Sequence, residues 1–227
     1  MRSIYGLSSA ARSFRFLRPK LAFCLRGFRV TKHLTMREIL NYLSKQYSEI
    51  SGDARLYITD HAYEKPVKAG DILLKKGEIC GHVWFIKKGL LLAREEDPED
   101  SSKVYNHWFM EENDIATSVL SFFKGVPAEE TIEAWEDGTV YAMSGKDLFA
   151  GLAKYPNLSM LTMKIIIGYY CQSRTIEKHL RMKSIDKIHQ YLLDHHADLL
   201  QRLPNKELAA FAGVSEPTYN KHKYRKE

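Results

Sequence analysis

Cysteine is scarce in this sequence. Of its 227 residues, only Cys24, Cys80 and Cys171 are cysteine. Their odd number and wide separation exclude a disulfide framework, and no spacing typical of a zinc site is present. An iron–sulfur cluster would need about four thiolate ligands, more than the chain holds. We therefore expect no metal site and no cofactor, and a reducing compartment, the cytoplasm, fits this cysteine usage best.

Long apolar runs and familiar catalytic motifs are also missing. The run KIIIGYY at 164–170 is far shorter than the roughly 18 residues that a membrane-spanning helix needs. The motifs G-x-S-x-G, H-E-x-x-H, C-x-x-C and G-x-G-x-x-G do not occur, and Gly145-Lys146 lacks the earlier glycine of a phosphate-binding loop. The sequence thus predicts no membrane association, no catalytic residues and no enzymatic activity.

Acidic residues are absent from positions 1–35, which hold eight Lys/Arg. This segment accounts for the formal net charge of +6, because the remaining chain has 26 Lys/Arg against 28 Asp/Glu. Three interpretations of the segment compete: a targeting sequence, a basic arm that grips phosphates, or a start assigned too early. We favour the third, with Met36 as the true start, because a clear helical pattern begins there.

Charge within the rest of the chain is unevenly distributed. Residues 94–137 contain thirteen acids and three bases, whereas residues 174–187 and 201–227 each carry a net charge of about +3. A protein with an acidic middle and a basic end can approach DNA with its basic end.

The hydrophobic pattern changes along the chain. Residues 36–50 have apolar side chains at helical spacing, and Ser51-Gly52-Asp53 ends that pattern. From about residue 60 to 144, short β-like runs are separated by turn residues. Regular short strands of this kind predict a small antiparallel barrel or roll. The runs are DILL, HVWFI, LLLA, VYNHWFM, TIEAW and TVYAMS.

Two longer helical patterns follow the strands. Residues 146–182 carry a broad apolar stripe, with Pro156-Asn157 as a helix-start signal, and residues 184–203 are amphipathic as well. A stripe this broad must cover the roll and something more. Histidines in the second pattern could suggest a metal, but adjacent histidines on a helix point to different faces and no acidic ligand converges with them. We expect solvated or capping side chains at His189, His195 and His196.

The segment PNKELAAFAGVSEPTYNKHK, residues 204–223, predicts two short helices joined by a tight turn. Asn205 can cap the first helix, and Gly213 tolerates the positive φ that stops it. Ser215 can cap the second helix, and Pro217 lies in its first turn, where the missing N–H does little harm. This spacing is that of a helix-turn-helix, although an ordinary helical hairpin would have it too.

Most polar side chains of the second helix would stay outside, while Tyr219 would point back into the small core. The outer side chains suit phosphates and base edges. The residues that we expect to contact DNA are Ser215, Glu216, Thr218, Asn220, Lys221, His222, Lys223 and Arg225.

The same segment resembles the C-terminal unit of Crp/Fnr-type transcriptional regulators, in a divergent, Bacteroidota-like form. The family's usual Leu-Ser-Arg after the matching threonine is Tyr219-Asn220-Lys221 here. Most of residues 60–145 resembles that family's cyclic-nucleotide-binding roll, through the Gly70-Asp71, Gly77-Glu78 and Gly89 ladder and the strand pair EAWEDGTVYAMS. The matching residues of the C-terminal unit are Glu207, Leu208, Ala209, Gly213, Val214, Ser215, Glu216, Pro217 and Thr218.

The resemblance implies an α+β fold in four parts. After the leader 1–35, residues 36–145 form an N-terminal helix and an antiparallel β-roll, a double-stranded β-helix or cupin-like jelly roll. Residues 146–182 form a long dimerisation helix, and residues 183–227 form the helix-turn-helix unit, which has no clear β-wing. The long helix would pair with its symmetry mate in a parallel homodimer, or else pack only on its own roll. The dimerising residues would be Leu161, Ile165, Tyr169 and Ile176.

The ligand pocket of the resembled family departs from its pattern here. The family's Gly-Asp-hydrophobic turn corresponds to Asn113-Asp114-Ile115, after which a Gly-Glu pair holds the ribose and an Arg holds the cyclic phosphate. Carboxylates replace that cation in this chain, so we expect no tight binding of cyclic AMP. The alternatives are a neutral or cationic ligand, or an empty vestigial pocket. The aligned positions are Thr117, Ser118, Ala128, Glu129 and Glu130.

These features predict a cytoplasmic, homodimeric, sequence-specific DNA-binding transcriptional regulator of Crp/Fnr type. Its roll would bias the orientation of two reading helices. Its partners would be DNA with a palindromic operator and a second copy of the chain, with RNA polymerase and an unidentified small-molecule effector as further candidates. The alternative is a dimeric ligand-binding or protein-interaction module whose vestigial hairpin does not read DNA.

Overall fold

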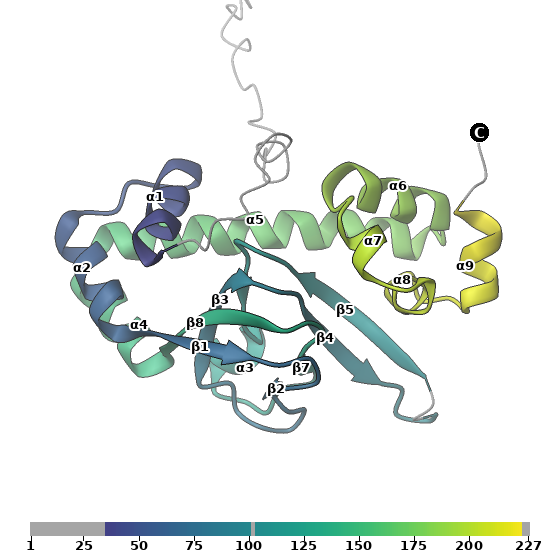
Figure 1. The fold of residues 1–227 in the computed structure, drawn as a ribbon, viewed down its shortest axis with the longest axis horizontal. Coiled ribbons are helices and arrows are strands. Elements are labelled where there is room, and N and C mark those ends of the chain that lie inside the picture. Colours follow the sequence, from purple (N-terminus) through teal and green to yellow (C-terminus); the bar gives the residue numbers. More distant parts are fainter. Residues whose placement is uncertain (1–34, 101–102, 224–227) are drawn as a thin grey trace, which may run out of the picture.

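The computed structural model describes residues 35–100 and 103–223 (Figure 1). Every strand pairing in this part of the chain is antiparallel, so the described chain is α+β. The elements are α1 (Met36–Gln46), α2 (Gly52–His61), β1 (Ala62–Val67), β2 (Ile72–Leu74), β3 (His82–Lys88), β4 (Leu91–Glu96), β5 (Val104–Met110), β6 (Ile115–Ala116), α3 (Val119–Lys124), β7 (Thr131–Ala134), β8 (Gly138–Ser144), α4 (Gly145–Lys154), α5 (Pro156–Arg181), α6 (Ile185–His195), α7 (Leu199–Arg202), α8 (Asn205–Phe211) and α9 (Glu216–His222).

Two four-stranded sheets form the sheet body, residues 62–144. Their strand orders are β1-β8-β3-β6 and β2-β7-β4-β5. All six β-like runs of the sequence fall on strands, because alternate side chains of each run turn to one face. Both sheets contribute such alternate residues to one core, which includes Trp84, Ile86, Leu91, Ala93, Ile132, Ala134, Val140 and Ala142.

The N-terminal region contains two helices where the sequence pattern predicts one over residues 36–50. In α1, Thr35 and Glu38 form a capping box. The unpredicted helix α2 begins at the Ser51-Gly52-Asp53 break itself, because the Ser51 hydroxyl accepts a bond from the Ala54 amide at 3.4 Å. The residues that end one helix therefore cap the next.

Each of the two longer predicted helices is divided. The pattern over 146–182 becomes α4 and α5, which separate at Tyr155 because its backbone is extended and Pro156 follows as the first residue of α5. The pattern over 184–203 becomes α6 and α7, since the backbone leaves the helical region at His196. The start signal at Pro156-Asn157 is confirmed as the beginning of α5.

Helix α5 spans the length of the molecule and packs on two further cores (Figure 1). Near its beginning, Leu158 and Leu161 pack with Ile39 and Leu40 of α1. Near its end, Ile176 joins a core that combines Leu92 of β4 and other residues of the sheet body with α6, α7, α8 and α9. The helices α6–α9, residues 185–222, are named the C-terminal helical unit below. None of the helices in the described part of the chain combines the length and the apolar composition that a membrane span requires.

Candidate functional site

The hairpin of α8 and α9 closely follows the sequence prediction. Gly213 has φ +65°, and the amide of Val214 bonds the Ala209 carbonyl at 3.1 Å, so the chain leaves α8 abruptly. Two details differ from the prediction. Pro204 takes the position before α8, and Asn205 is the first helical residue. The Asn205 amide oxygen instead accepts a bond from the Lys223 ammonium at 3.0 Å, which ties the two helices together. Ser215 holds the position before α9, but its hydroxyl lies 2.8 Å from the Thr218 hydroxyl and makes no capping bond to the backbone.

The inner face of α9 is anchored by Tyr219, which is fully buried as predicted. Its hydroxyl lies 2.8 Å from Nδ1 of His189 on α6, so α9 is held to α6 as well as to α8. Burial is the main cause that lowers the pKa of His189, with the nearby Lys223 ammonium adding to it. The His189 side chain thus supports α9 and is not a solvated residue.

The outer face of α9 carries part of the predicted DNA-contacting set. Ser215, Glu216 and Lys221 are exposed at the end of the molecule that lies farthest from α4 (Figure 1). The amide oxygen of Asn220 is buried, so that side chain turns inward. Arg225 lies outside the described residues. The other half-buried members of the set are Thr218, His222 and Lys223.

The C-terminal helical unit is docked on the sheet body through largely buried ions, which the sequence did not reveal. Glu207 of α8 accepts hydrogen bonds from Arg94 of β4 at 2.6 Å and from the Asn106 side chain of β5 at 2.9 Å. Arg94 also donates to Glu133 at 3.0 Å. Beside these ions, Phe211 of α8 packs on Phe109.

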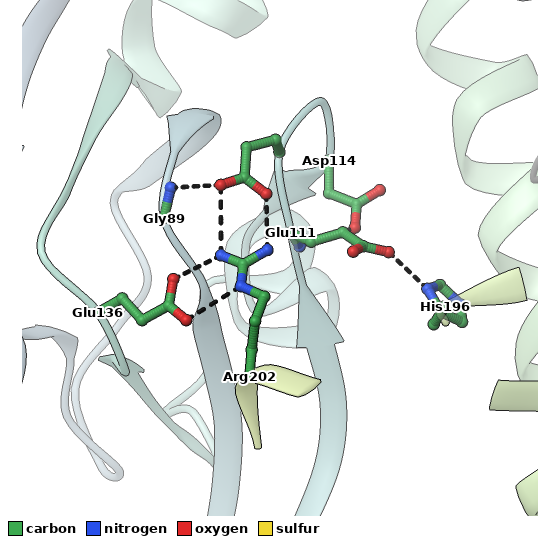
Figure 2. Close-up of polar contacts among 7 residues, drawn as sticks. Gly89, Glu111, Asp114, Glu136, His196 and Arg202 are labelled. Atoms are coloured by element: carbon green, nitrogen blue, oxygen red, sulfur yellow. Dashed lines mark hydrogen bonds and ion pairs between the residues drawn. The ribbon is translucent and has the colours of Figure 1, made fainter. Parts of the chain in front are cut away.

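A second ion cluster surrounds Arg202 of α7 (Figure 2). Its guanidinium donates to both oxygens of Glu136 at 3.0 and 2.6 Å and to both oxygens of Glu112 at 2.8 and 3.2 Å. Glu112 in turn accepts the Gly89 amide at 2.8 Å. Burial alone would lower the pKa of Arg202, but the hydrogen bonds and charges of the two carboxylates raise it above its ordinary value. This cation therefore stays charged and holds α7 against two turns of the sheet body.

A third contact involves the turn between β5 and β6. Nδ1 of His196, at the end of α6, lies 2.7 Å from Oε1 of Glu111 (Figure 2). In the same turn, Asp114 accepts a bond from the Tyr169 hydroxyl of α5 at 3.2 Å. Burial, reinforced by the Glu111 carboxylate, raises the pKa of Asp114 from 3.8 to about 7. His196 is thus the half-buried residue that caps the end of α6, and its ring contacts a carboxylate of the sheet body.

The residues predicted to form the ligand pocket lie on both sides of α3, in the segment after β6 and in the segment before β7. The Thr117 hydroxyl donates to the His82 carbonyl at 3.1 Å, and Ser118 and Ala128 are buried. The Glu129 side chain is exposed and Glu130 is half-buried. Within residues 35–100 and 103–223, no three His, Cys, Asp or Glu side chains are arranged to hold a metal ion.

The four residues expected to dimerise lie inside the protomer. Leu161, Ile165 and Ile176 are buried, and Tyr169 contacts Asp114, because α5 must cover both α1 and the sheet body. The prediction chose the stripe of α5 that faces the chain's own cores. The apolar side chains that α5 leaves exposed are Met160, Met163, Ile166, Ile167 and Tyr170.

One sequence feature could have indicated the docking contacts. The acidic stretch 94–137 and the basic stretch 201–227 have opposite charge, and this agrees with the pairing of Arg202 on α7 with Glu112 and Glu136. The Arg94–Glu207 pair that holds α8 runs the other way, because its cation belongs to the acidic stretch and its carboxylate to the basic one. The pattern does not say which residues pair, because Arg94 and Glu207 are 113 positions apart.

Comparison with known proteins supports the fold. Residues 64–155 match the family model of the cyclic nucleotide-binding domain. A comparison with curated protein sequences gives no significant match. Among solved structures, similar chains include the c-di-GMP-responsive global regulator CLP from Xanthomonas campestris, with 12% identity, a TM-score of 0.58, and coverage of 75% of this chain and 89% of that one.

Two further structural neighbours have similar values. A transcriptional regulator of the crp/fnr family from Eubacterium rectale shares 15% identity with a TM-score of 0.60, covering 76% of this chain and 82% of that one. FixK2 from Bradyrhizobium japonicum shares 13% identity with a TM-score of 0.57, covering 71% and 82%. At such identities the similarity shows the fold: a cyclic nucleotide-binding domain with added helices, whose structural neighbours are Crp/Fnr regulators.

Proposed function

We propose that this protein is a sequence-specific DNA-binding regulator of transcription of the Crp/Fnr type. The observation that carries the proposal is the α8–α9 hairpin, in which the buried Tyr219 holds α9 from behind while Glu216 and Lys221 face solvent. A helix supported in this way can enter the major groove of DNA, which is wide enough to admit it. Attachment of the hairpin to a cyclic nucleotide-binding fold supports the same proposal.

The exposed positions of α9 would make the most direct contacts. Lys221 suits a phosphate or a guanine, Ser215 suits a phosphate, and Glu216 can accept a bond from the amino group of cytosine. Asn220 would support α9 from inside, because its amide oxygen is buried. Arg225 remains an expected phosphate contact. Side chains at the edge of the helix would assist, namely Thr218, His222 and Lys223.

We infer a parallel homodimer through the exposed face of α5. Met160, Met163, Ile167 and Tyr170 are three and four residues apart, which is the spacing of a coiled-coil seam. One short reading helix contacts few base pairs, so a two-fold pair that meets successive major grooves, about 34 Å apart, would supply the remaining contacts. A palindromic operator follows from that symmetry.

The sheet body would act as a scaffold or as a sensor for something other than cyclic AMP. The chain has Ala128, followed by the carboxylates of Glu129 and Glu130, where the resembled pattern has a phosphate-binding arginine, and like charges repel a phosphate. We propose that the body biases the orientation of α9 through the docked C-terminal helical unit.

Selection of duplexes from a random pool by the full chain tests this function. We expect enrichment of an inverted repeat, and the same repeat when cyclic AMP is present. Glu216→Ala should relax the preference at one base of each half-site by roughly tenfold, since one good base contact contributes about 1–3 kcal/mol of discrimination. Glu129→Ala makes the same charge change on the sheet body and should leave the preference intact.

Two results would contradict the proposal. One is a pool that stays random through repeated rounds, which would favour a ligand-binding or protein-interaction module. The other is a base preference that Glu216→Ala and Glu129→Ala change equally, which would remove α9 from the reading role. A repeat whose enrichment depends on cyclic AMP would overturn the proposal for the sheet body.

A further inference from the structure

The junction of α5 and α6 lies beside α9, at the end of the molecule farthest from α4 (Figure 1). Nδ1 of His222, the last residue of α9, lies 4.0 Å from Oδ1 of Asp186 in the first turn of α6. The Tyr219 hydroxyl of α9 lies 2.8 Å from His189 of the same helix. A duplex whose groove holds α9 therefore has a phosphate backbone near the first turn of α6, because the backbones flank the groove on both sides.

Cations outnumber acids at this junction. Residues 174–187 contain five Lys/Arg and two Asp/Glu, a net charge of +3. Both acids already have neighbours, because Glu177 contacts two arginines of α5 and Asp186 faces His222. Three exposed lysines form no ion pair within residues 35–100 and 103–223, namely Lys178, Lys183 and Lys187.

Lys178 and Lys187 belong to different helices but act on the same ring. Burial is the main cause that lowers the pKa of His179 on α5, and the ammonium groups of Lys187 and Lys178 lower it further. The two cations are therefore close enough to repel each other. An anion that lies across such a cluster relieves this repulsion.

Lys183 has a backbone conformation that favours glycine. It follows the last turn of α5 with φ +49°, and its amide donates to the Leu180 carbonyl at 2.9 Å while the Ser184 amide donates to the His179 carbonyl at 3.1 Å. The turn after α8 has the same pair of bonds, but there the residue with positive φ is Gly213. A strained residue at a place where glycine fits better indicates a use for its side chain, which here is an exposed ammonium.

We propose that Lys178, Lys183 and Lys187 form a second phosphate-binding surface, which holds the backbone of the duplex beside the groove that α9 enters. This inference rests on the proposed binding of DNA and adds a contact outside the helix-turn-helix. An ammonium group is a point charge that carries no base preference, so the surface strengthens binding to every sequence.

The salt dependence of binding tests this surface. Lys183→Gly/Lys187→Ala removes two of the three cations, and fluorescence anisotropy of the full chain on a random-sequence duplex gives the slope of log K against log salt. Each lost lysine–phosphate contact changes the slope by about 0.9. The slope should therefore become shallower by about 3.6 for a dimer that loses four contacts, or by about 1.8 if one protomer binds alone.

Three further variants separate charge, position and folding. Lys183→Arg/Lys187→Arg keeps both charges and should keep the wild-type slope. Lys124→Ala/Lys146→Ala removes two exposed lysines from α3 and α4 and should also leave the slope unchanged. Lys183→Gly alone should weaken binding without lowering the midpoint of urea unfolding, because glycine adopts this backbone conformation without strain.

A wild-type slope in Lys183→Gly/Lys187→Ala would overturn the second surface, even where selection enriches an inverted repeat and so supports DNA reading. An equal change in Lys124→Ala/Lys146→Ala would overturn it as well, because the effect would then follow the net charge alone. A selected pool that stays random, with a slope that still depends on Lys183 and Lys187, would contradict sequence-specific reading but support the surface. A chain that binds no duplex would contradict both proposals.

Discussion

Glu207 is one of the residues through which positions 204–223 resemble a helix-turn-helix, but its carboxylate contacts the sheet body. It is buried, and it receives hydrogen bonds from Arg94 and Asn106 of the sheet body. Charges removed from water are stabilised only while each keeps its partner, because an unpaired buried ion loses its hydration without compensation. Glu207 therefore belongs to the helix-turn-helix pattern and also holds α8 against the sheet body.

A double-mutant cycle measures this contact at the scale of single residues. Glu207→Ala should lower the free energy of unfolding by roughly 3–5 kcal/mol, because it leaves Arg94 with less compensation in a largely buried position. Arg94→Ala should have a similar effect, and the double variant should lose less than the sum by about 1–3 kcal/mol. Urea unfolding gives all three values.

The exposed pair Arg174–Glu177 on α5 is the matched control. Its cycle should show coupling of only about 0.2–1 kcal/mol, since exposed ion pairs are hydrated and screened by salt. If the effects of Glu207→Ala and Arg94→Ala simply add, the contact does not hold α8 on the sheet body.

At the scale of single residues, the sequence predicted features that depend on neighbouring positions and missed contacts between distant positions. The turn at Gly213 and the burial of Tyr219 follow from spacing within ten residues, and both were predicted. The inward Asn220 amide, the Asn205–Lys223 bond and the Glu207–Arg94 pair depend on groups that the fold brings together. No periodicity in one segment contains that information.

At the scale of elements, strands were easier to predict than helix ends. A strand needs only alternation, and every predicted β-like run is part of a strand. An apolar helical pattern does not show where one helix ends and the next begins. The pattern of residues 146–182 continues on both sides of Tyr155, and that of residues 184–203 continues on both sides of His196. The strands β1 and β6 and the helices α2 and α3 were not predicted, since each buries only one or two side chains.

Helix α5 shows that the apolar stripe selected from the sequence for a partner can instead be used inside the protomer. Its most regular apolar residues are used to cover α1 and the sheet body, and the exposed stripe next to them is available for a partner. Ile167→Glu should therefore convert a dimer to a folded monomer, because it places a charge in the proposed seam at a side chain that is 52% exposed. Sedimentation velocity gives the mass, and circular dichroism checks the fold.

Ser173→Glu adds the same charge to an exposed position of α5 outside the proposed seam and should leave the mass of the dimer unchanged. Leu161→Ala, inside the protomer, should lower the free energy of unfolding by about 2–5 kcal/mol through the cavity it leaves. If Ile167→Glu keeps the wild-type mass, the copies of the chain do not pair along this stripe.

At the scale of the whole molecule, the charges are distributed along its long axis. The acidic stretch lies in the sheet body, and α4 and α9 lie at opposite ends of the molecule (Figure 1). At the docking side, Arg94 and Arg202 offset part of the charge of the four carboxylates that they contact. Lys221 is exposed on α9, so it can face a phosphate backbone. The binding of DNA by this end should depend on salt.

Lys221 allows that dependence to be measured residue by residue. Each lysine that neutralises a phosphate releases counterions, and the slope of log K against log salt changes by about 0.9 for each such contact on duplex DNA. A dimer places two copies of Lys221 on the DNA, so Lys221→Ala should make the slope shallower by about 2 and weaken binding to all sequences alike.

Lys146→Ala removes an exposed lysine from α4, at the opposite end of the molecule, and should leave the slope unchanged. Fluorescence anisotropy at several salt concentrations gives both slopes. Equal slopes for Lys221→Ala and wild type would mean that α9 does not face the phosphates, and a change of about 1 would mean that one protomer alone binds the duplex.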